Sequence, residues 1–264
     1  MTELSTTPSS SPISLNRGNA AAQIIADLRD QILQGRYPRG SKLPSERELA
    51  QWYQVSVPTV REAIRGLSAV CLVEPRHGMG VYVTAAADLM FAMAASTLIE
   101  LENVQLLEVL DTFEALQGKA VVLACVNASD EELEALVAVL DALDNAPTNA
   151  DLADHLRTFL TLLAGASHNA LISTICSFLS KLFIEIVQDE LIGLGPHWRE
   201  VAMQLSPDRR LLAQALRQRD VARSVALAAE YHQHTKRLVA DVLAASGNEA
   251  GAMMRRAVKR VRAG

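Results

Sequence analysis

The stretch LPSERELA (Leu43–Ala50) decides the fold together with two stretches that follow it, VSVPTVREAIRGL (Val55–Leu67) and LVEPRHGMGVYV (Leu72–Val83). In the first, Ser45 and Glu48 have the spacing of a capping box, in which each side chain bonds the backbone amide of the other residue. This stretch therefore predicts the start of a short helix, and the two later stretches predict what is attached to it.

The second and third stretches predict a helix followed by a β-hairpin. Ser56 is expected to cap the helix, and Pro58 is tolerated in its first turn because first-turn amides have no acceptor within the helix. The β-type runs Cys71–Glu74 and Val81–Thr84 are predicted to be strands, joined by a turn over Arg76–Gly80 whose glycines permit positive φ.

Upstream, apolar residues recur at helical spacing from Asn19 to Gln34 and predict a first helix. Residues 1–17 are mostly Ser, Thr and Pro and are expected to be a disordered arm. A helix, a helix–turn–helix and a two-stranded hairpin are the elements of a winged helix-turn-helix. Residues 18–84 are therefore predicted to form a DNA-binding domain of this type.

Every segment after Thr84 has a helical pattern, so the fold class is mainly α, with an all-helical bundle over residues 88–246. We expect this second domain to bind a ligand and to dimerise, and we expect residues 247–264 to be a disordered basic tail, with a membrane-binding or DNA-binding arm as the alternative. The predicted helices are Asp88–Leu101, Val104–Cys125, Asp130–Asp144, Asp151–Gly165, Ala170–Leu191, Pro207–Gln218 and Asp220–Ala245.

Composition excludes several classes of protein. The chain has 264 residues and a net charge of −5, but residues 1–84 carry nine basic against seven acidic residues, so a polyanion is repelled mainly by the middle of the chain. Its 3 cysteines form no CxxC pair, which argues against a disulfide framework and fits a reducing cytoplasm. No apolar run approaches the ~20 residues that span a bilayer, so we expect no membrane segment and a cytoplasmic, nucleoid-associated protein.

The second helix of a helix-turn-helix lies in the major groove with its N-terminal residues nearest the bases. Here Thr59 can reach a phosphate or a base, and Arg61 can place its guanidinium on guanine O6 and N7. Arg47, on the preceding helix, is placed to touch backbone or base. The wing tip at His77 and Gly78 is slim enough to approach a phosphate or the minor groove.

These motifs resemble the winged helix of GntR-family bacterial transcription factors, and the helical remainder resembles the FadR-like (FCD) subgroup. The second resemblance is carried by the Glu114 region, by LAGASHNALI (Leu163–Ile172) and by ALRQRDVARSVALAAEYH (Ala215–His232). It implies a transcriptional regulator, commonly a repressor that an effector releases from DNA. The DNA-contacting positions then fall on Arg47, Ser56, Thr59, Arg61 and His77.

One position departs from the family pattern: Val57 stands where the family usually has arginine, and it offers an apolar contact to a thymine methyl instead. Arg65 lies one turn beyond Arg61 and Gly78 follows His77, so both join the predicted interface. Each residue also has a structural interpretation. Arg61 and Arg65 could pair with a neighbouring acid, Glu46 could be a solvated helix start, and His77 a turn residue.

Two rival functions come from other classes. An enzyme needs a nucleophile with a base, a metal cluster or a phosphate loop, and the sequence has no GxxxxGK[ST], GxSxG, GxGxxG or HExxH motif, so we predict that the chain is not an enzyme. The alternative is a helical scaffold protein whose N-terminal domain binds another protein. Because one winged helix contacts few base pairs, a DNA-binding chain is expected to be a homodimer on a palindromic operator.

The resemblance also implies a divalent metal held by an Asp and a His four residues apart and by two later histidines. Those positions fall on Leu156, Leu160, Arg209 and Tyr231, and the family's effector-binding arginine falls on Leu110. None of these side chains is a good donor for a divalent ion, so we predict no metal and no cofactor. A shift of one residue would bring His155 and His232 into play.

The preferred interpretation is a metal-free pocket, and a filled core is the alternative. Apolar walls with one cation favour an amphipathic effector such as a fatty acid, an acyl-CoA or an aromatic or terpenoid acid, whose carboxylate or thioester-linked phosphate pairs with the arginine. The predicted effector-binding residues are Leu110, Leu156, Leu160, Asn169, Arg209, Tyr231 and His232.

Overall fold

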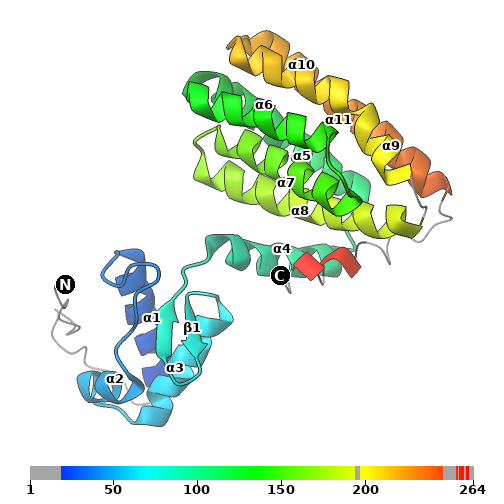
Figure 1. Cartoon of the computed structure of the whole chain (residues 1–264). Coiled ribbons are helices and arrows are strands. Elements are labelled where there is room, and N and C mark those ends of the chain that lie inside the picture. Colours follow the sequence, from blue (N-terminus) through cyan, green and yellow to red (C-terminus); the bar gives the residue numbers. More distant parts are fainter. Residues whose placement is uncertain (1–18, 194–196, 246–253, 255, 259, 262–264) are drawn as a thin grey trace. The chain divides into compact units, whose positions relative to one another are not determined.

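The computed structural model describes residues 19–193, 197–245, 254, 256–258 and 260–261 (Figure 1). Contacts between Cα atoms divide the chain into two compact units between Met90 and Phe91, and each unit is described by itself. The predicted arm over residues 1–17 lies outside the described residues.

The first unit is a winged helix-turn-helix, as predicted. Ser45 Oγ accepts from the Glu48 amide, and the Glu48 carboxylate accepts from the Ser45 amide at 2.7 Å, which confirms the capping box. Ser56 caps the next helix. The elements are α1 (Ala20–Leu33), α2 (Glu46–Tyr53), α3 (Val57–Ala69), β1 (Val73–Arg76) and β2 (Gly80–Val83).

The hairpin is real, but its strands lie one or two residues nearer the turn than predicted. β1 and β2 pair antiparallel, from Val73 opposite Val83 to Arg76 opposite Gly80. The predicted strand start at Cys71 was wrong because the backbone there is still hydrogen-bonded to the end of α3. The Leu72 amide donates to the carbonyl of Leu67. Local periodicity does not reveal this longer helix ending.

The core of the winged helix lies between α1, α2, α3 and the hairpin. Gly66 allows α3 to pack closely against α1, because a Cβ at this position would lie only 2.5 Å from Ile25 Cδ1. The largest fully buried side chains of this unit come from several elements and are Ile24, Leu28, Leu49 and Leu67.

The second unit is all-helical (Figure 1). It contains the predicted helices with boundaries shifted by up to two residues, and one helix, α9, that was not predicted. The helices are α4 (Ala87–Glu102), α5 (Leu106–Asn127), α6 (Asp130–Asp144), α7 (Asn149–Gly165), α8 (Ala170–Gly193), α9 (His197–Gln204), α10 (Ser206–Arg217) and α11 (Val221–Ala245).

The helices α5 to α8, α10 and α11 pack around one apolar cluster. Ser129 with Glu132 and Thr148 with Asp151 form capping boxes at the starts of α6 and α7. Lys236 on α11 pairs with Asp111 and Glu114 on α5, which ties the last long helix to the first helix of the bundle.

The expectation of a disordered basic tail was wrong for the part of it that the structure describes. The described residues between positions 254 and 261 are helical, and those at 254, 257, 258 and 261 are buried in the apolar cluster. Arg260, on the exposed side, lies 4.0 Å from Glu185 of α8. The prediction considered only the basic residues of this segment. Its apolar residues recur at helical spacing and form the opposite face of the helix.

Within the described part of the chain, no helix combines the length and the apolar character that crossing a membrane requires.

Candidate DNA interface and effector site

The first turn of α3 presents the predicted recognition residues with their hydroxyls already fixed. Ser56 Oγ accepts a hydrogen bond from the amide of Thr59 at 3.4 Å, and the two side-chain oxygens lie 2.8 Å apart. Ser56 is exposed and Thr59 is half-buried, so both can be reached from solvent. A helix start that carries two solvent-accessible hydroxyls suits the binding of a phosphate oxygen.

Arg61 is not free in this structure: it forms a two-point ion pair with Glu46 on α2. Arg61 Nη2 lies 2.8 Å from Glu46 Oε2, and Nε lies 3.1 Å and 3.2 Å from the two carboxylate oxygens. This carboxylate raises the pKa of Arg61 above its already high value. The Arg61 side chain is still 52% exposed, so the pair lies at the surface.

The other residues of the predicted interface differ in exposure. Arg47 on α2 and Arg65 on α3 are exposed. Val57 is half-buried and packs against the core of the winged helix, so only part of its surface is available for a thymine methyl.

The wing tip is exposed and shaped by glycine. Gly78 has φ of +70° and Gly80 has φ of +106°, which most L side chains disfavour, and His77 stands next to them in solvent. At the turn end of β1, Arg76 pairs with Glu74 at 2.8 Å and lies over the ring of Tyr82, 4.6 Å from its centroid.

Two side chains of this surface were not assigned a role from the sequence. Glu46 was interpreted as a solvated helix start, and Arg76 only as a turn residue. The signal for Glu46 was weak, because its partner is 15 positions away on another helix, and only the crossing of the two helices brings them together.

Three leucines predicted to line the effector pocket are buried in one apolar cluster. Leu110 on α5, Leu156 on α7 and Leu160 on α7 are each less than 5% exposed and belong to the core of the second unit. This burial is compatible both with a pocket wall and with a filled core.

Arg209 on α10 is fully buried, with no exposed surface. Its Nη2 donates to the carbonyl of Ala202 on α9 at 2.6 Å. Its Nε and Nη1 are buried as well, and within the described residues neither has a hydrogen-bond partner. An interior cation without a carboxylate is unfavourable, because burial removes the hydration that normally stabilises the charge.

His232 and Tyr231 on α11 are also buried, and the centroids of their rings lie 5.4 Å apart. The His232 ring lies edge-on to Phe113 of α5, with centroids 5.7 Å apart. Burial lowers the pKa of His232 to about 4, and its Nε2 has no hydrogen-bond partner among the described residues. Tyr231 is 4% exposed and does not belong to the apolar cluster that holds the three leucines.

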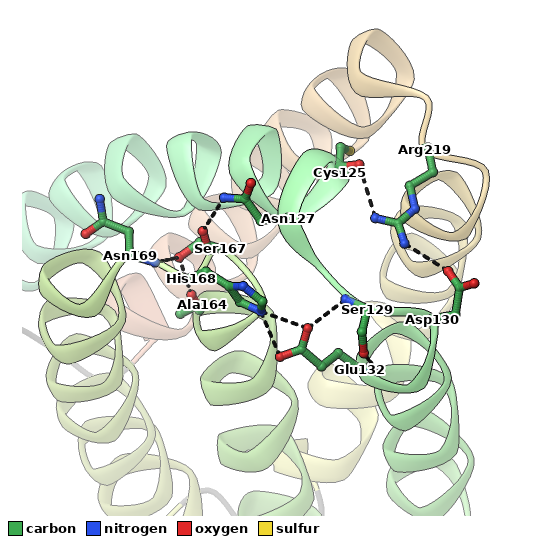
Figure 2. Close-up of polar contacts among 10 residues, drawn as sticks. All are labelled: Cys125, Asn127, Ser129, Asp130, Glu132, Ala164, Ser167, His168, Asn169 and Arg219. Carbon is green, nitrogen blue, oxygen red and sulfur yellow. Dashed lines mark hydrogen bonds and ion pairs between the residues drawn. The ribbon is translucent and has the colours of Figure 1, made fainter.

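Asn169 does not lie with these buried residues, which corrects its predicted place in the pocket. It is exposed at the turn between α7 and α8, where its Oδ1 accepts from the amide of Ile172 at 3.0 Å. Figure 2 shows this end of the bundle, where the neighbouring His168 bonds Glu132 of α6 and Asn127 donates to the carbonyl of Ser167. Asn169 therefore has a helix-capping role.

The residues present do not fit the divalent metal that the family resemblance implies. Leu156 and Leu160 have no donor atom, and Arg209 places a positive charge where a cation would have to bind. Within the described part of the chain, no three His, Cys, Asp or Glu side chains are grouped as metal ligands. His232 and His234 diverge, since His234 Nδ1 bonds Asp208 at 2.7 Å while His232 faces Phe113.

Comparison with protein families gives two matches in this order along the chain. Residues 20–83 match "Bacterial regulatory proteins, gntR family", and residues 108–234 match "FCD domain". The first match covers the winged helix, and the second covers the helices that carry the buried arginine and histidine.

Curated relatives carry the same kind of description. The chain is 32% identical over 139 residues to the HTH-type transcriptional regulator Rv0494 of Mycobacterium tuberculosis, which is 51% of this chain and 56% of that protein. It is 28% identical over 161 residues to LutR of Bacillus subtilis, covering 60% of this chain and 73% of LutR. It is 32% identical over 117 residues to the Exu regulon transcriptional regulator of Escherichia coli K12, covering 44% and 45%.

The chain thus spans about half the length of the first and third of these relatives. Among solved structures, Streptococcus agalactiae GntR matches with a TM-score of 0.63 and 22% identity, over 82% of this chain and 99% of that one. This likeness shows a common fold. The matched families and these relatives are transcriptional regulators, in agreement with the prediction that the chain is not an enzyme.

Proposed function

The chain belongs to the GntR family of bacterial regulatory proteins, with an FCD domain after its winged helix, and from this premise we propose that it is a sequence-specific transcriptional regulator of the bacterial cytoplasm. Its α3 would enter the major groove of an operator, and its wing would contact the flanking backbone. The FCD domain would bind a small molecule that changes the affinity for DNA.

The observation that carries this proposal is the exposed surface made by the first turn of α3 and the wing. Ser56, Thr59 and Arg61 offer hydroxyl and guanidinium donors along one helix start, and Arg47 and Arg65 add exposed positive charge. Phosphate contacts fix the register of a protein on DNA, and an arginine fork can read a guanine. This surface combines both kinds of group.

We propose further that the protein acts as a homodimer on a palindromic operator. One winged helix reads only a few base pairs, whereas discrimination over a genome needs about 10³–10⁷ in affinity over non-specific DNA. Two half-sites related by a two-fold axis supply the additional contacts. A monomer in light scattering at micromolar concentration, with operator DNA present, contradicts this part of the proposal.

For the effector, we propose an organic acid bound at Arg209 without a metal, and we propose that its binding releases the protein from DNA as in a repressor. The support is the buried guanidinium with two nitrogens that lack partners in the described residues, next to an apolar core. A carboxylate would satisfy those nitrogens with charge-assisted hydrogen bonds, and an apolar tail would gain from leaving water. This combination favours an amphipathic acid over a small hydroxy acid.

Two measurements test the function. A duplex selected by the protein from a random pool should show a two-fold symmetric sequence, and its affinity should fall steeply with salt because binding displaces counterions from DNA. A thermal-shift screen of carboxylic acids should then identify a stabilising compound that weakens the gel shift. Absence of any selected sequence, or of any salt dependence, favours a protein-binding scaffold instead.

A further inference from the structure

The contact between Arg61 and Glu46 uses one specific edge of the guanidinium. A guanidinium has five N–H groups, and Glu46 takes the side edge, through Nε and Nη2. Among the described residues, no acceptor bonds the end edge, made by Nη1 and the second hydrogen of Nη2, so this edge is left for another acceptor. That end edge is a pair of parallel donors, which matches the O6 and N7 acceptors of a guanine.

Glu46 is itself well fixed, because it is the first residue of α2. The helix start is held by the hydrogen bonds between Ser45 and Glu48 directly beside it. A carboxylate in the first turn of a helix is also stabilised by the helix dipole. The Glu46 side chain is 30% exposed and that of Arg61 is 52% exposed, so the carboxylate is the less accessible member of the pair.

We propose that Glu46 is a positioning residue for base recognition, which holds the Arg61 fork in its reading orientation before DNA arrives. An arginine side chain loses rotamer entropy when it is ordered on a base, and a partner that already orders it removes part of that loss on binding. The inference rests on the proposed function, because it needs a DNA operator to be read.

The carboxylate has a second effect, on non-specific DNA. At a site without a guanine for Arg61, the negative charge of Glu46 repels the DNA phosphates and no base contact offsets this repulsion. Glu46 therefore weakens binding to non-specific DNA. Glu46 should therefore contribute more to the ratio of specific to non-specific affinity than to affinity alone.

The experiment compares Glu46→Gln with Glu62→Gln in the full-length protein. Both substitutions remove one negative charge near the same surface, but Glu62 is exposed on α3 and is not the acid that pairs with Arg61. The probe is an operator selected by the wild-type protein from random duplexes, together with a scrambled duplex of equal length. Far-ultraviolet circular dichroism and a thermal melt check that each variant is folded.

We expect Glu46→Gln to lower the specific-to-non-specific ratio about tenfold relative to Glu62→Gln, within the range of discrimination that one bidentate base contact supplies. Single replacement of each operator guanine by 7-deazaguanine, which lacks the N7 acceptor, locates the base that Arg61 reads. The 7-deazaguanine replacement at that position should weaken binding of the wild-type protein. It should weaken binding of Glu46→Gln less, whereas replacements at the other guanines should affect both proteins equally.

Three outcomes overturn the inference. Equal ratios for the two variants mean that only net charge matters, and a higher ratio for Glu46→Gln means that Glu46 competes with DNA for Arg61. An unchanged sensitivity to 7-deazaguanine means that the fork is aligned without Glu46. If the wild-type protein selects no sequence at all, the proposed function fails, whereas a wild type that selects an operator isolates the role of Glu46.

Discussion

The hydroxyl of Tyr53 on α2 donates a hydrogen bond to Oδ2 of Asp27 on α1, with an oxygen–oxygen distance of 2.5 Å. The same oxygen accepts from Gln31 Nε2 at 2.6 Å, one turn further along α1. Burial, followed by the hydrogen bond to Asp27 and its charge, raises the pKa of Tyr53, so the hydroxyl stays a donor. This contact fixes α2, and with it the start of the helix-turn-helix, against α1.

The first prediction follows from that contact. Tyr53→Phe should lower the free energy of unfolding of the winged helix by about 1–3 kcal/mol, because a part-buried charged acceptor loses one donor. Urea unfolding followed by the fluorescence of Trp52, the neighbouring residue, measures it. Tyr82→Phe on the half-exposed wing strand is the control and should change stability little; equal losses in both variants contradict a special role for the Asp27 contact.

Removing the Arg61 side chain from α3 should abolish operator binding without unfolding the protein. Arg61→Ala removes the fork, and its side chain lies on the exposed side of α3, so circular dichroism should report unchanged helical content. A gel shift with the selected operator is the measurement. Arg29→Ala, which breaks an exposed pair with Asp30 on α1, is the matched control. Unchanged affinity of Arg61→Ala rules out its assignment to base reading.

Arg209→Met should abolish the response to an acid without lowering stability. The methionine fills a similar space, and it removes a buried charge whose Nε and Nη1 lack partners in the described structure. The probes are decanoic, benzoic and lactic acids in gel shifts and thermal melts. Arg210→Met, at the neighbouring exposed position paired with Asp141 and Asp144, is the control.

Two results contradict this effector assignment. One is an acid-induced release from the operator that survives in Arg209→Met. The other is stoichiometric zinc, nickel or manganese in the purified protein by elemental analysis, or a melting temperature that falls on treatment with a chelator.

The buried His232 makes stability depend on pH. Its pKa is lowered to about 4 by burial, while nearby Glu114 opposes the shift and Lys236 adds to it. The unfolded chain, with a histidine pKa of about 6.5, therefore binds the proton first, and stability is lost as the pH falls below that value. We expect a loss of about 2 kcal/mol between about pH 7 and 5 from this group.

Chemical denaturation at several pH values measures this loss in the wild type and in His232→Gln. The variant cannot titrate at this position, so its stability should fall less steeply over the same range. His77→Gln, on the exposed wing, should leave the slope unchanged. Parallel curves for the wild type and His232→Gln assign the pH dependence to other groups.

The C-terminal helical segment should be part of the stable second unit. Val258→Asp places a charge at a fully buried position of the apolar cluster and should lower the free energy of unfolding by several kcal/mol. Gln214→Asp introduces the same side chain at an exposed position of α10 and should have a small effect. Similar melting temperatures for the two variants would restore the expectation of a detached tail.

The order of the elements could be predicted from the sequence because the residues that start each helix lie next to it in the chain. Ser45, Ser56 and Ser129 each cap the helix predicted from them, and α6 has the predicted boundaries. Periodic apolar residues from Asn19 to Gln34 then predicted α1, and Ile24, Leu28 and Ile32 of that helix are buried in the core of the winged helix. These patterns involve residues close together in sequence, so they can be recognised without knowledge of the tertiary structure.

The parts that were missed depend on partners far away in the chain. The carboxylate of Glu46 becomes important only through the crossing of α2 and α3, and Asn169 was placed by family resemblance although it caps an exposed turn. The helical segment around Val258 looks like a basic tail until the bundle that covers it is considered. Interactions between residues close in sequence determine the helices, whereas contacts between residues far apart in sequence determine which polar groups lie together.

The capping boxes have a consequence for the order of events during synthesis. Each is complete within four consecutive residues, so the starts of α2, α6 and α7 can form as soon as those residues leave the ribosome. Helices form in about a microsecond, whereas translation adds about 5–20 residues per second. The winged helix can therefore assemble while the second unit is still being made. The segment containing Val258 is made after the helices against which it packs, so a chain that stops before this segment would leave apolar surface exposed to chaperones and proteases.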